Sequence, residues 1–418
     1  MLLLTLLVVL SIVSAQNNVS EEYYGASHRL ASFLLDQHDR CSPPDGIVQV
    51  THNIELVHII GVNELQQNMQ VLVYIVEEWS DQSLSWSPST FDNITDTWLP
   101  ETSIWVPDII VFNTLEHKDL LHAVRSPIRV RFDGKVSYSY PAIYTVLCPI
   151  GIAKFPFDDQ SCNLTFASWA YSEDKVLLNT LHKPLLKNYC PNDEWALQDV
   201  MFVREEYEHE ETVVSEIIYC IRVARKPFYY LVNLVMPSYI ICILSIAGLF
   251  ARFSTRHERQ ERFTLGVTAI LSMAVLSLVV TEKVPHSSEN VPLLIVWFHF
   301  IIVMVTVATI LTSTVMRVHE NGYKEGMHSP PLWMRRLLFI KDTAIKFTKM
   351  HHKLMLDIHT TAEQWGEVSR RMDYVLALLF IIIISTPTFY LFYLCNIMDL
   401  SSRERMLLRE AHNNRIVM

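Results

Sequence analysis

Two glutamates, two threonines and three aliphatic residues recur at helical spacing along one uncharged stretch of the sequence. They begin and end at the borders of residues 263–280, which contain no Asp, Glu, Lys or Arg. Because the steps are of three or four residues, these side chains share one face of a helix about 31 Å long. The face consists of Glu261, Thr264, Thr268, Leu271, Val275, Leu278 and Glu282.

If several copies of the chain surround an axis, each position on this face becomes a ring. Rings of carboxylates attract cations and repel anions. Glu261, with Glu258 one turn before it, would form inner rings, and Glu282 an outer ring. Leu271 and Val275 would form an apolar constriction that closes by dewetting. Charge that merely flanks a lipid-packed helix is the alternative, but it leaves the aligned threonines unexplained. We therefore predict a gated cation pore.

Four uncharged apolar stretches place this face in a membrane. Residues 228–250, 263–280, 292–316 and 374–398 are each long enough to cross a hydrocarbon core of about 30 Å as a helix. The loop 251–262 carries four arginines, whereas the loop 281–291 carries one lysine. Basic short loops favour the cytoplasmic side, so the region before the first stretch and the tail after the last are predicted to lie outside.

The region before the first stretch reads as an exported β domain. Residues 1–15 are apolar and end in Val-Ser-Ala, as a secretory signal does. Alternating apolar runs such as residues 71–76 predict an antiparallel β-sandwich between about residues 21 and 226. Asn18, Asn93 and Asn163 each begin an acceptor triplet for N-glycosylation. The net charge of −10 argues against nucleic-acid binding.

The seven cysteines suggest one disulfide and leave a second open. Cys148 and Cys162 enclose thirteen residues. A bridge between them would constrain the unfolded chain by roughly 3 kcal/mol in the loop-entropy model. Cys190 and Cys220 are candidates for a second bridge, which would leave Cys41 free, but spacing does not fix that pairing. Cys242 and Cys395 fall in apolar stretches and are expected to be unpaired packing residues.

Several motifs occur together in one known family. The pore-forming stretch starts with Gln260-Glu261-Arg262, and no Pro-Ala insertion precedes Arg262. The segment between Cys148 and Cys162 contains a Phe-Pro-Phe-Asp turn. Further matches are Trp79-x-Asp-x-x-Leu-x-Trp86, Trp105-x-Pro-Asp108, Val284-Pro285, the Pro-Pro-Leu-Trp-Met-Arg-Arg run at 330–336 and the Ala-Glu-Gln-Trp run at 362–365. From about residue 28 to 398, the chain resembles the Cys-loop (pentameric) ligand-gated ion channels, in particular the cation-selective, nicotinic acetylcholine receptor-like branch.

The resemblance implies an extracellular antiparallel β-sandwich followed by a four-helix transmembrane bundle, assembled as a homo- or heteropentamer. The expected organisation is a signal peptide (1–15), a ligand-binding sandwich (16–227), three membrane helices (228–316), a cytoplasmic loop (317–373), a fourth membrane helix (374–398) and an extracellular tail (399–418). The expected location is the plasma membrane, at a postsynaptic site. No cofactor or metal is expected, and no nucleophile–base set suggests an enzyme.

The resemblance also implies an aromatic ligand box between neighbouring subunits. Aromatic faces bind quaternary ammonium groups. Trp169 resembles the central tryptophan, Phe112 stands for a usual tyrosine, and Tyr207 resembles the aromatic residue of the capping loop. Tyr74 and Tyr138 would contribute from the opposite face of a neighbouring copy. The other tryptophans near these motifs are expected in the sandwich core, namely Trp79, Trp86 and Trp105.

The capping segment departs from the family pattern. It lacks the adjacent Cys-Cys pair of principal acetylcholine-binding subunits, and Val214 stands where a second tyrosine is expected. Five glutamates surround Tyr207. Three roles are open for these glutamates. They would attract a cationic amine, titrate together with His209, or form a solvated acidic loop without a binding role.

The resemblance finally implies a coupling junction. Arg225 resembles an arginine that pairs with a carboxylate of an early loop, here Glu64. This pair would meet the turn that contains Phe155, Pro156 and Asp158, and also Pro285. A structural salt bridge at a domain boundary is the alternative.

The sequence is compatible with three functions. The first is a neurotransmitter-gated cation channel subunit that responds to acetylcholine or a related amine. The second is a structural or non-principal subunit of a heteropentamer. The third is a channel gated by another ligand, such as protons or another amine.

Overall fold

A computed structural model describes residues 25–119, 127–180, 184–209, 212–251, 256–284, 290–321, 330–338, 353–397 and 400–413. The proposed signal peptide and Asn18 lie outside these residues. The chain forms two compact units, each described by itself. The first contains residues up to Ile150, Asp159–Ala224 and Leu400–Met418, and the second contains Gly151–Asp158 and Arg225–Asp399.

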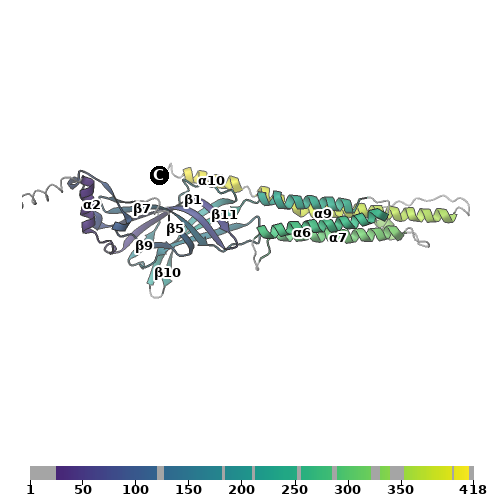
Figure 1. The fold of residues 1–418 in the computed structure, drawn as a ribbon, viewed down its shortest axis with the longest axis horizontal. Coiled ribbons are helices and arrows are strands. Elements are labelled where there is room, and N and C mark those ends of the chain that lie inside the picture. Colours follow the sequence, from purple (N-terminus) through teal and green to yellow (C-terminus); the bar gives the residue numbers. More distant parts are fainter. Residues whose placement is uncertain are drawn as a thin grey trace, which may run out of the picture. The chain divides into compact units, whose positions relative to one another are not determined.

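The first unit is a β-sandwich, as predicted. After helix α2 (Ala26–Gln37), one sheet has the strand order β3-β6-β7-β2-β1-β9, with β5 also paired to β7, and the other has the order β10-β11-β8-β4 (Figure 1). The bounds of the first sheet are β1 Val48–Asn63, β2 Asn68–Ser80, β3 Asp96–Leu99, β5 Thr114–Asp119, β6 Ile128–Arg131, β7 Lys135–Leu147 and β9 Val176–Asn179. Those of the second are β4 Ile109–Val111, β8 Asp159–Ser168, β10 Trp195–His209 and β11 Thr212–Arg225.

Alternation of side chains along the strands explains the core. In β2, the residues at 71, 73 and 75 are buried valines and an isoleucine, whereas Tyr74 between them is exposed. Successive side chains of a strand point to opposite faces, so such a pattern buries one face of each sheet. Trp79, Trp86 and Trp105 belong to this core, as predicted, and the rings of Trp79 and Trp105 pack edge to face with centroids 6.2 Å apart.

One disulfide prediction is confirmed and one is wrong. Cys148 and Cys162 are bonded, with an S–S distance of 1.95 Å and Cα atoms 5.1 Å apart. Cys190 and Cys220 are both free, because Cys190 lies exposed beside β1 while the Cys220 sulfur lies 3.1 Å from Ser161 Oγ on β8. Cys242 is buried and Cys395 is half-buried, and both are unpaired as expected.

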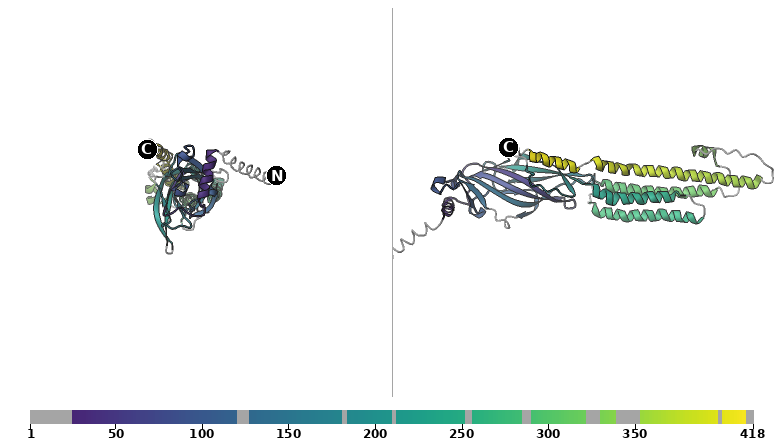
Figure 2. Two further views of the ribbon diagram at one scale, coloured as in Figure 1. Left: turned by 90° about the vertical axis from the view of Figure 1, so that its left-hand side faces the viewer. Right: turned by 90° about the horizontal axis from the view of Figure 1, so that it is seen from above.

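A C-terminal helix completes the sandwich unit. Helix α10 (Leu400–Asn413) packs against β10 (Figures 1 and 2). Leu407 and Leu408 contact the sandwich core. The carboxylate of Glu404 is buried and accepts a hydrogen bond of 3.1 Å from the backbone N–H of Leu197. The tail of the chain is therefore part of the first unit.

The second unit is a bundle of long apolar helices. Among the described residues, four helical spans are long and apolar enough to cross a membrane: Phe228–Leu249, Glu261–Glu282, Leu293–Glu320 and Glu363–Ile397. The first consists of α4 (Phe228–Tyr230), a π-helical turn (Leu231–Val235) and α5 (Met236–Leu249). The others lie in α6 (Arg256–Lys283), α7 (Leu293–Asn321) and α9 (Lys353–Ile397), and a short helix α8 covers Leu332–Leu337. α6 packs on α5 and α7, and α7 packs on α9 (Figure 2).

Gly266 allows α6 and α7 to approach closely. A Cβ atom added to Gly266 would lie 2.5 Å from Oγ1 of Thr309 and 2.7 Å from its Cγ2. Overpacking of this kind costs about 1–3 kcal/mol. We expect Gly266→Ala to lower the amount of channel at the cell surface, measured by surface biotinylation, and Thr309→Ala to restore it in the double variant. Gly366→Ala is the matched control, because a Cβ atom there meets nothing within 4 Å. Equal surface levels for Gly266→Ala and the control would contradict this account of the helix contact.

Candidate functional site

Two aromatic side chains predicted for the ligand box lie together on the surface of the second sheet. Trp169 follows the end of β8, and Phe112 follows the end of β4. Backbone hydrogen bonds join these strand ends, from Phe112 N to Thr165 O at 2.9 Å and from Trp169 N to Asp108 O at 3.2 Å. The ring centroids are 6.0 Å apart, and the side chains are 45% (Phe112) and 72% (Trp169) exposed. The pair forms an aromatic surface open to a ligand.

Asp108 holds the turn that carries Trp169. One of its carboxylate oxygens accepts a hydrogen bond of 2.6 Å from Ser168 Oγ, and the other accepts one of 2.6 Å from the N–H of Ala170. Asp108 belongs to the Trp105-x-Pro-Asp108 motif, whose pattern alone does not indicate this role. Its position before a short strand and its two acceptor oxygens explain why an aspartate suits this place.

The remaining predicted box residues are dispersed. Tyr207 lies on β10 and is 51% exposed, and Tyr74 lies on β2 and is 39% exposed. Tyr138 is buried in the core, and its hydroxyl donates a hydrogen bond of 2.5 Å to Glu101. The prediction that Tyr138 offers its ring to a ligand is therefore not supported by the structure of this chain.

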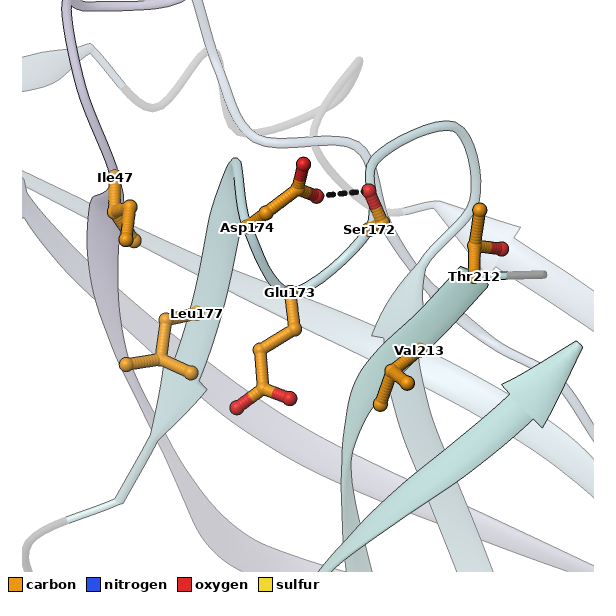
Figure 3. Close-up of a pocket in the computed structure, with 7 residues that line it drawn as sticks. All are labelled: Ile47, Ser172, Glu173, Asp174, Leu177, Thr212 and Val213. Carbon is orange, nitrogen blue, oxygen red and sulfur yellow. Dashed lines mark hydrogen bonds between the residues drawn. The ribbon is translucent and has the colours of Figure 1, made fainter.

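A cavity of about 500 Å³ lies at the turn formed by Ser172, Glu173 and Asp174, which follow Trp169 in the chain (Figure 3). Hydrogen bonds join this turn to both strands of the hairpin formed by β10 and β11, which contains the capping segment. The N–H of Glu173 donates to Val213 O on β11 at 2.8 Å, and the Glu173 carboxylate accepts from Arg204 on β10 at 3.1 Å. Any displacement of the hairpin therefore acts directly on the segment that carries Trp169. The cavity is lined by Ile47, Ser172, Glu173, Asp174, Leu177, Thr212 and Val213.

A buried titratable pair, His52 and Glu77, lies inside the sandwich and was missed from the sequence. The two residues are cross-strand partners on β1 and β2, and both are almost fully buried. His52 Nε2 lies 4.0 Å from Glu77 Oε1 and has no hydrogen-bond partner among the residues that the structure describes. Tyr140 on β7 donates a hydrogen bond of 3.0 Å to Glu77. The signal was available, because both residues occupy inward positions of alternating strands.

Burial shifts both pKa values of this pair. Desolvation raises the pKa of Glu77 to about 8, against a smaller opposing effect of the hydrogen bond from Tyr140. Desolvation lowers the pKa of His52 to about 3. Burial disfavours the charged form of either group, so the pair binds a proton close to neutral pH and does so on the carboxylate.

Tyr219 fixes the tautomer of His52. Its hydroxyl donates a hydrogen bond of 2.8 Å to the backbone oxygen of His52 and lies 3.1 Å from the ring nitrogen Nδ1. Having given its proton to the backbone, this hydroxyl accepts from Nδ1–H. Nε2 is then the unprotonated nitrogen, and its lone pair is directed into the space shared with Glu77.

The predicted pore face lies on the exposed part of α6, which in the single chain also includes Phe263, Val267 and Val279. All seven residues from Glu261 to Glu282 on this face are exposed, whereas the residues at 262, 266, 269, 273 and 280 are buried against the bundle. The hydroxyl of Thr268 bonds back to the carbonyls of Thr264 and Leu265 at 3.0 and 2.9 Å. The side chain of Glu258 lies outside the described residues. The face thus presents two carboxylates, two threonines and three aliphatic residues on the exposed surface of α6.

The turn at Gly151–Asp158 belongs to the helical unit and contacts two of its helices. Its carbonyls at Ala153 and Phe155 accept hydrogen bonds of 3.1 and 3.3 Å from the N–H groups of Leu293 and Leu294, at the start of α7. The ring of Phe155 packs on Tyr230 with centroids 4.9 Å apart. The turn therefore caps α7 at its free amide groups.

Arg225 forms a buried ion pair with Asp158 of this turn. Its Nε lies 3.0 Å and its Nη2 3.4 Å from the two carboxylate oxygens, and both side chains are 1% exposed. The guanidinium carbon lies 4.8 Å from the centroid of the Phe155 ring. Glu64 was the expected partner of Arg225; the structure shows an ion pair with Asp158, and the pair with Glu64 stays a prediction. Pro156 is buried in the turn, and Pro285 lies outside the described residues.

Two of the proposed glycosylation positions are accessible. Asn93, in a turn after η2 (Pro88–Thr90), and Asn163, on β8, both have exposed side chains. No group of three or more His, Cys, Asp or Glu side chains in the described part of the chain is arranged to hold a metal ion.

Two family profiles match the chain. Residues 27–227 match the neurotransmitter-gated ion-channel ligand binding domain, and residues 234–357 match the neurotransmitter-gated ion-channel transmembrane region. These matches cover the sandwich, α6 and its neighbouring helices.

Curated relatives include receptors with several ligands. The chain is 73% identical to the proton-gated ion channel subunit pbo-6 of Caenorhabditis elegans over 392 residues, which cover 94% of this chain and 93% of that protein. It is 33% identical to the acetylcholine receptor subunit alpha-type deg-3 of the same organism, over 70% of this chain and 53% of that protein. It is 31% identical to the neuronal acetylcholine receptor subunit alpha-2 of Gallus gallus, over 74% of this chain and 59% of that protein.

These matches agree with the structure in pointing to one family. The features that the family shares are the β-sandwich, the disulfide that encloses the Phe-Pro turn, and the long apolar helices. The chain belongs to the neurotransmitter-gated ion channels, the Cys-loop family of pentameric ligand-gated membrane channels, which are receptors and not enzymes.

Proposed function

We propose that this chain is a subunit of a cation channel of the plasma membrane that opens when the extracellular medium is acidified. The observation that carries the proposal is its 73% identity, along 94% of its length, to a subunit named as proton-gated. The missing Cys-Cys pair in the capping segment supports it, because a principal acetylcholine site would use that pair. Proton gating thus replaces an acetylcholine or amine agonist as the main assignment.

The buried pair His52 and Glu77 is the proton site that the geometry favours. Without its proton, the Glu77 carboxylate faces the lone pair of His52 Nε2 at 4.0 Å, and the two repel each other. With its proton, Glu77 becomes a donor, and Nε2 is the free acceptor in front of it. Protonation converts a repulsive contact into a hydrogen bond between β1 and β2, and Tyr219 extends that contact to β11 in the other sheet.

The exposed face of α6 supports the assignment of cation selectivity. Carboxylates at Glu261 and Glu282 would form rings in a pentamer, with Leu271 and Val275 between them as the constriction. The proposed topology keeps the sequence-based boundaries, with residues 16–227 and 399–418 outside and residues 317–373 inside. The place of α10 within the sandwich unit supports the extracellular tail.

An amine-gated receptor is the second candidate, and the exposed aromatic pair Trp169 and Phe112 favours it. A non-principal subunit of a heteropentamer could carry this aromatic pair and still lack the Cys-Cys pair of the capping segment. If the chain is an amine receptor subunit, we propose a postsynaptic location for it.

Current recordings distinguish these candidates. We expect oocytes that express the chain, alone or with a related nicotinic-type subunit, to give inward cation currents when the bath is stepped from pH 8 to pH 6. Acetylcholine, choline and betaine applied at pH 8 should give none. Currents that need an amine and ignore the pH step would exclude proton gating and favour the second candidate.

A further inference from the structure

His38, directly after helix α2, has a buried side chain whose hydrogen bonds fix the place of its proton. The side chain is 3% exposed, and Nδ1 lies 2.7 Å from Ser83 Oγ. That hydroxyl donates its proton to Asp81 Oδ1 at 2.7 Å, so it accepts from Nδ1–H. The other ring nitrogen, Nε2, accepts a hydrogen bond of 3.0 Å from the backbone N–H of Trp105. The imidazole is therefore neutral, with its proton on Nδ1.

Asp81 offers this imidazole a negative charge. Its Oδ2 lies 3.4 Å from Nδ1 of His38, and its side chain is 4% exposed. Its Oδ1 also accepts a hydrogen bond of 2.9 Å from the backbone N–H of Ser83, in the short helix η1 (Gln82–Leu84), which holds the carboxylate against the ring. An opposite charge so close favours the charged form of a histidine.

The other charged side chains on the segments around His38 are exposed or make contacts of their own. Asp36, in the last turn of α2, is exposed. The rest lie next to His38 in the chain, on β3, on the short helix η3 (Glu101–Ser103) and on the hairpin of β6 and β7. Their contacts are Asp39 with the N–H of Cys41, Arg40 with the carbonyl of Thr102, Asp96 with Arg129, Glu101 with Tyr138, Arg131 with Asp133, and Lys135 with Glu78. Within the described ranges of the chain, Asp81 carries the carboxylate that lies within 4.0 Å of the ring.

A further proton on His38 would bind at Nε2. This nitrogen could then no longer accept from the N–H of Trp105, whereas Nδ1–H would gain a charged attraction to Asp81. Trp105 lies three residues before Asp108, whose carboxylate holds the turn that carries Trp169. The ring of Trp105 also packs edge to face on Tyr171, two residues after Trp169, with centroids 6.2 Å apart. Loss of the bond to His38 therefore acts on the support of the exposed aromatic pair.

We infer that His38 is a second proton-binding site of this chain, in which acid breaks the bond from the imidazole to the Trp105 amide and pairs the imidazolium with Asp81. The proton comes from the medium and binds Nε2, while Asp81 stays ionised. Histidine side chains change charge between about pH 5 and pH 8, the range in which an acid-gated channel responds. The inference rests on the proposed proton gating for its effect on the current. The release of Trp105 rests on the geometry around His38 alone.

Hydrogen exchange at the Trp105 amide tests the site without any current. The full chain, purified in detergent, is compared at about pH 8 and pH 5, with the intrinsic pH dependence of exchange corrected for. We expect this amide to lose roughly fivefold or more of its protection at the lower pH, as the loss of one hydrogen bond predicts. His38→Gln should keep the protection at both pH values, because its amide oxygen can accept at the place of Nε2 and does not titrate. His28→Gln is the matched control, since His28 is exposed in the first turn of the same helix, and it should behave as the wild type.

Two further measurements use the ion pair and the current. Asp81→Asn should keep the protection at the higher pH and move its loss to a lower pH, because the imidazolium then lacks its counter-charge. In recordings, His38→Gln should raise the proton concentration for half-maximal current roughly fivefold, a common size for the coupling between two sites. His28→Gln should leave that concentration unchanged.

Two results would overturn the proposal. One is an equal corrected exchange of the Trp105 amide at both pH values in the wild type. The other is a loss of protection in His38→Gln as large as in the wild type, which would assign the change to another group. If His38→Gln does not fold, Asp81→Asn decides, and a loss at the wild-type pH would exclude the ion pair. A chain whose amide responds to acid but whose current does not would retain the site and contradict proton gating, so the two failures are distinct.

Discussion

Replacing Asp158 with asparagine is expected to abolish most of the acid-evoked current. The change leaves Arg225 with a charge, 1% exposed, and removes its bidentate partner at 3.0 and 3.4 Å. Breaking one side of a buried ion pair costs about 3–5 kcal/mol, which corresponds to a change of about a hundredfold or more in an equilibrium constant. Because the pair lies on the turn that caps α7, both assembly and gating should suffer.

Surface biotinylation and current recording together measure this effect. Asp159→Asn is the matched control, since Asp159 is the next residue, carries the same charge and is exposed. Arg225→Gln should reproduce the loss from the other side of the pair. Wild-type surface levels and currents in Asp158→Asn would mean that the ion pair has no part in assembly or gating.

Replacing Glu77 with glutamine is expected to remove the response to pH between about 6.5 and 8. Glutamine keeps the size of the side chain and, like the protonated acid, can donate a hydrogen bond to His52. Under the proposed proton gating, channels with this change should therefore conduct at pH 8, where wild-type channels should stay closed. The measurement is the current as a function of bath pH. A wild-type pH curve in Glu77→Gln would eliminate this pair as the proton site.

Glu78 is the control for this prediction. It follows Glu77 on β2, so it points to the opposite face of the sheet, where it pairs with Lys135 at 2.8 Å. Glu78→Gln should leave the pH curve in place, because its side chain is accessible to water and lies outside the core.

The same pair predicts how stability depends on pH. The folded pKa of Glu77 is raised from 4.5 to about 8, so its contribution to stability is full below pH 4.5 and is lost as the pH rises through 8. The folded pKa of His52 is lowered from 6.5 to about 3, so its contribution is present above pH 6.5 and is lost as the pH falls through 3. Between pH 4.5 and pH 6.5 the contribution of Glu77 falls with pH as steeply as that of His52 rises, so the stability does not change. Between 6.5 and 8 stability should fall as pH rises, by up to about 1.4 kcal/mol per pH unit. Thermal unfolding of the full chain in detergent measures this slope, and Glu77→Gln should remove it.

The periodicity of apolar residues in the sequence predicted which side chains of a strand or helix face the core. Trp79 and Trp105 are buried as expected, whereas the pore-lining role of the face from Glu261 to Glu282 stays a prediction, because other positions of α6 such as Phe263 are exposed too. The same period of two could have identified His52 and Glu77. Glu77 occupies the inward position between Ile75 and Trp79, where a charged residue calls for an explanation.

Long-range pairing could not be derived in the same way. Tyr138 was predicted for the ligand face, but its side chain lies on the buried face of β7, and strand registers decide which face that is. Asp158 became the partner of Arg225 because the turn at Gly151–Asp158 belongs to the helical unit, which no local pattern shows. The proposed bridge of Cys190 to Cys220 failed because spacing carries no information on the distance between strands.

Helix α10 has a consequence for biosynthesis. The sandwich unit includes residues that follow the last long helix, since Leu407 and Leu408 join its core and Glu404 binds the backbone of β10. Synthesis runs from the first residue to the last, so the ribosome makes the sandwich strands long before it makes this helix. The sandwich unit can reach this form only after the last long helix and α10 have been made, and until then the surface of β10 that receives α10 stays uncovered.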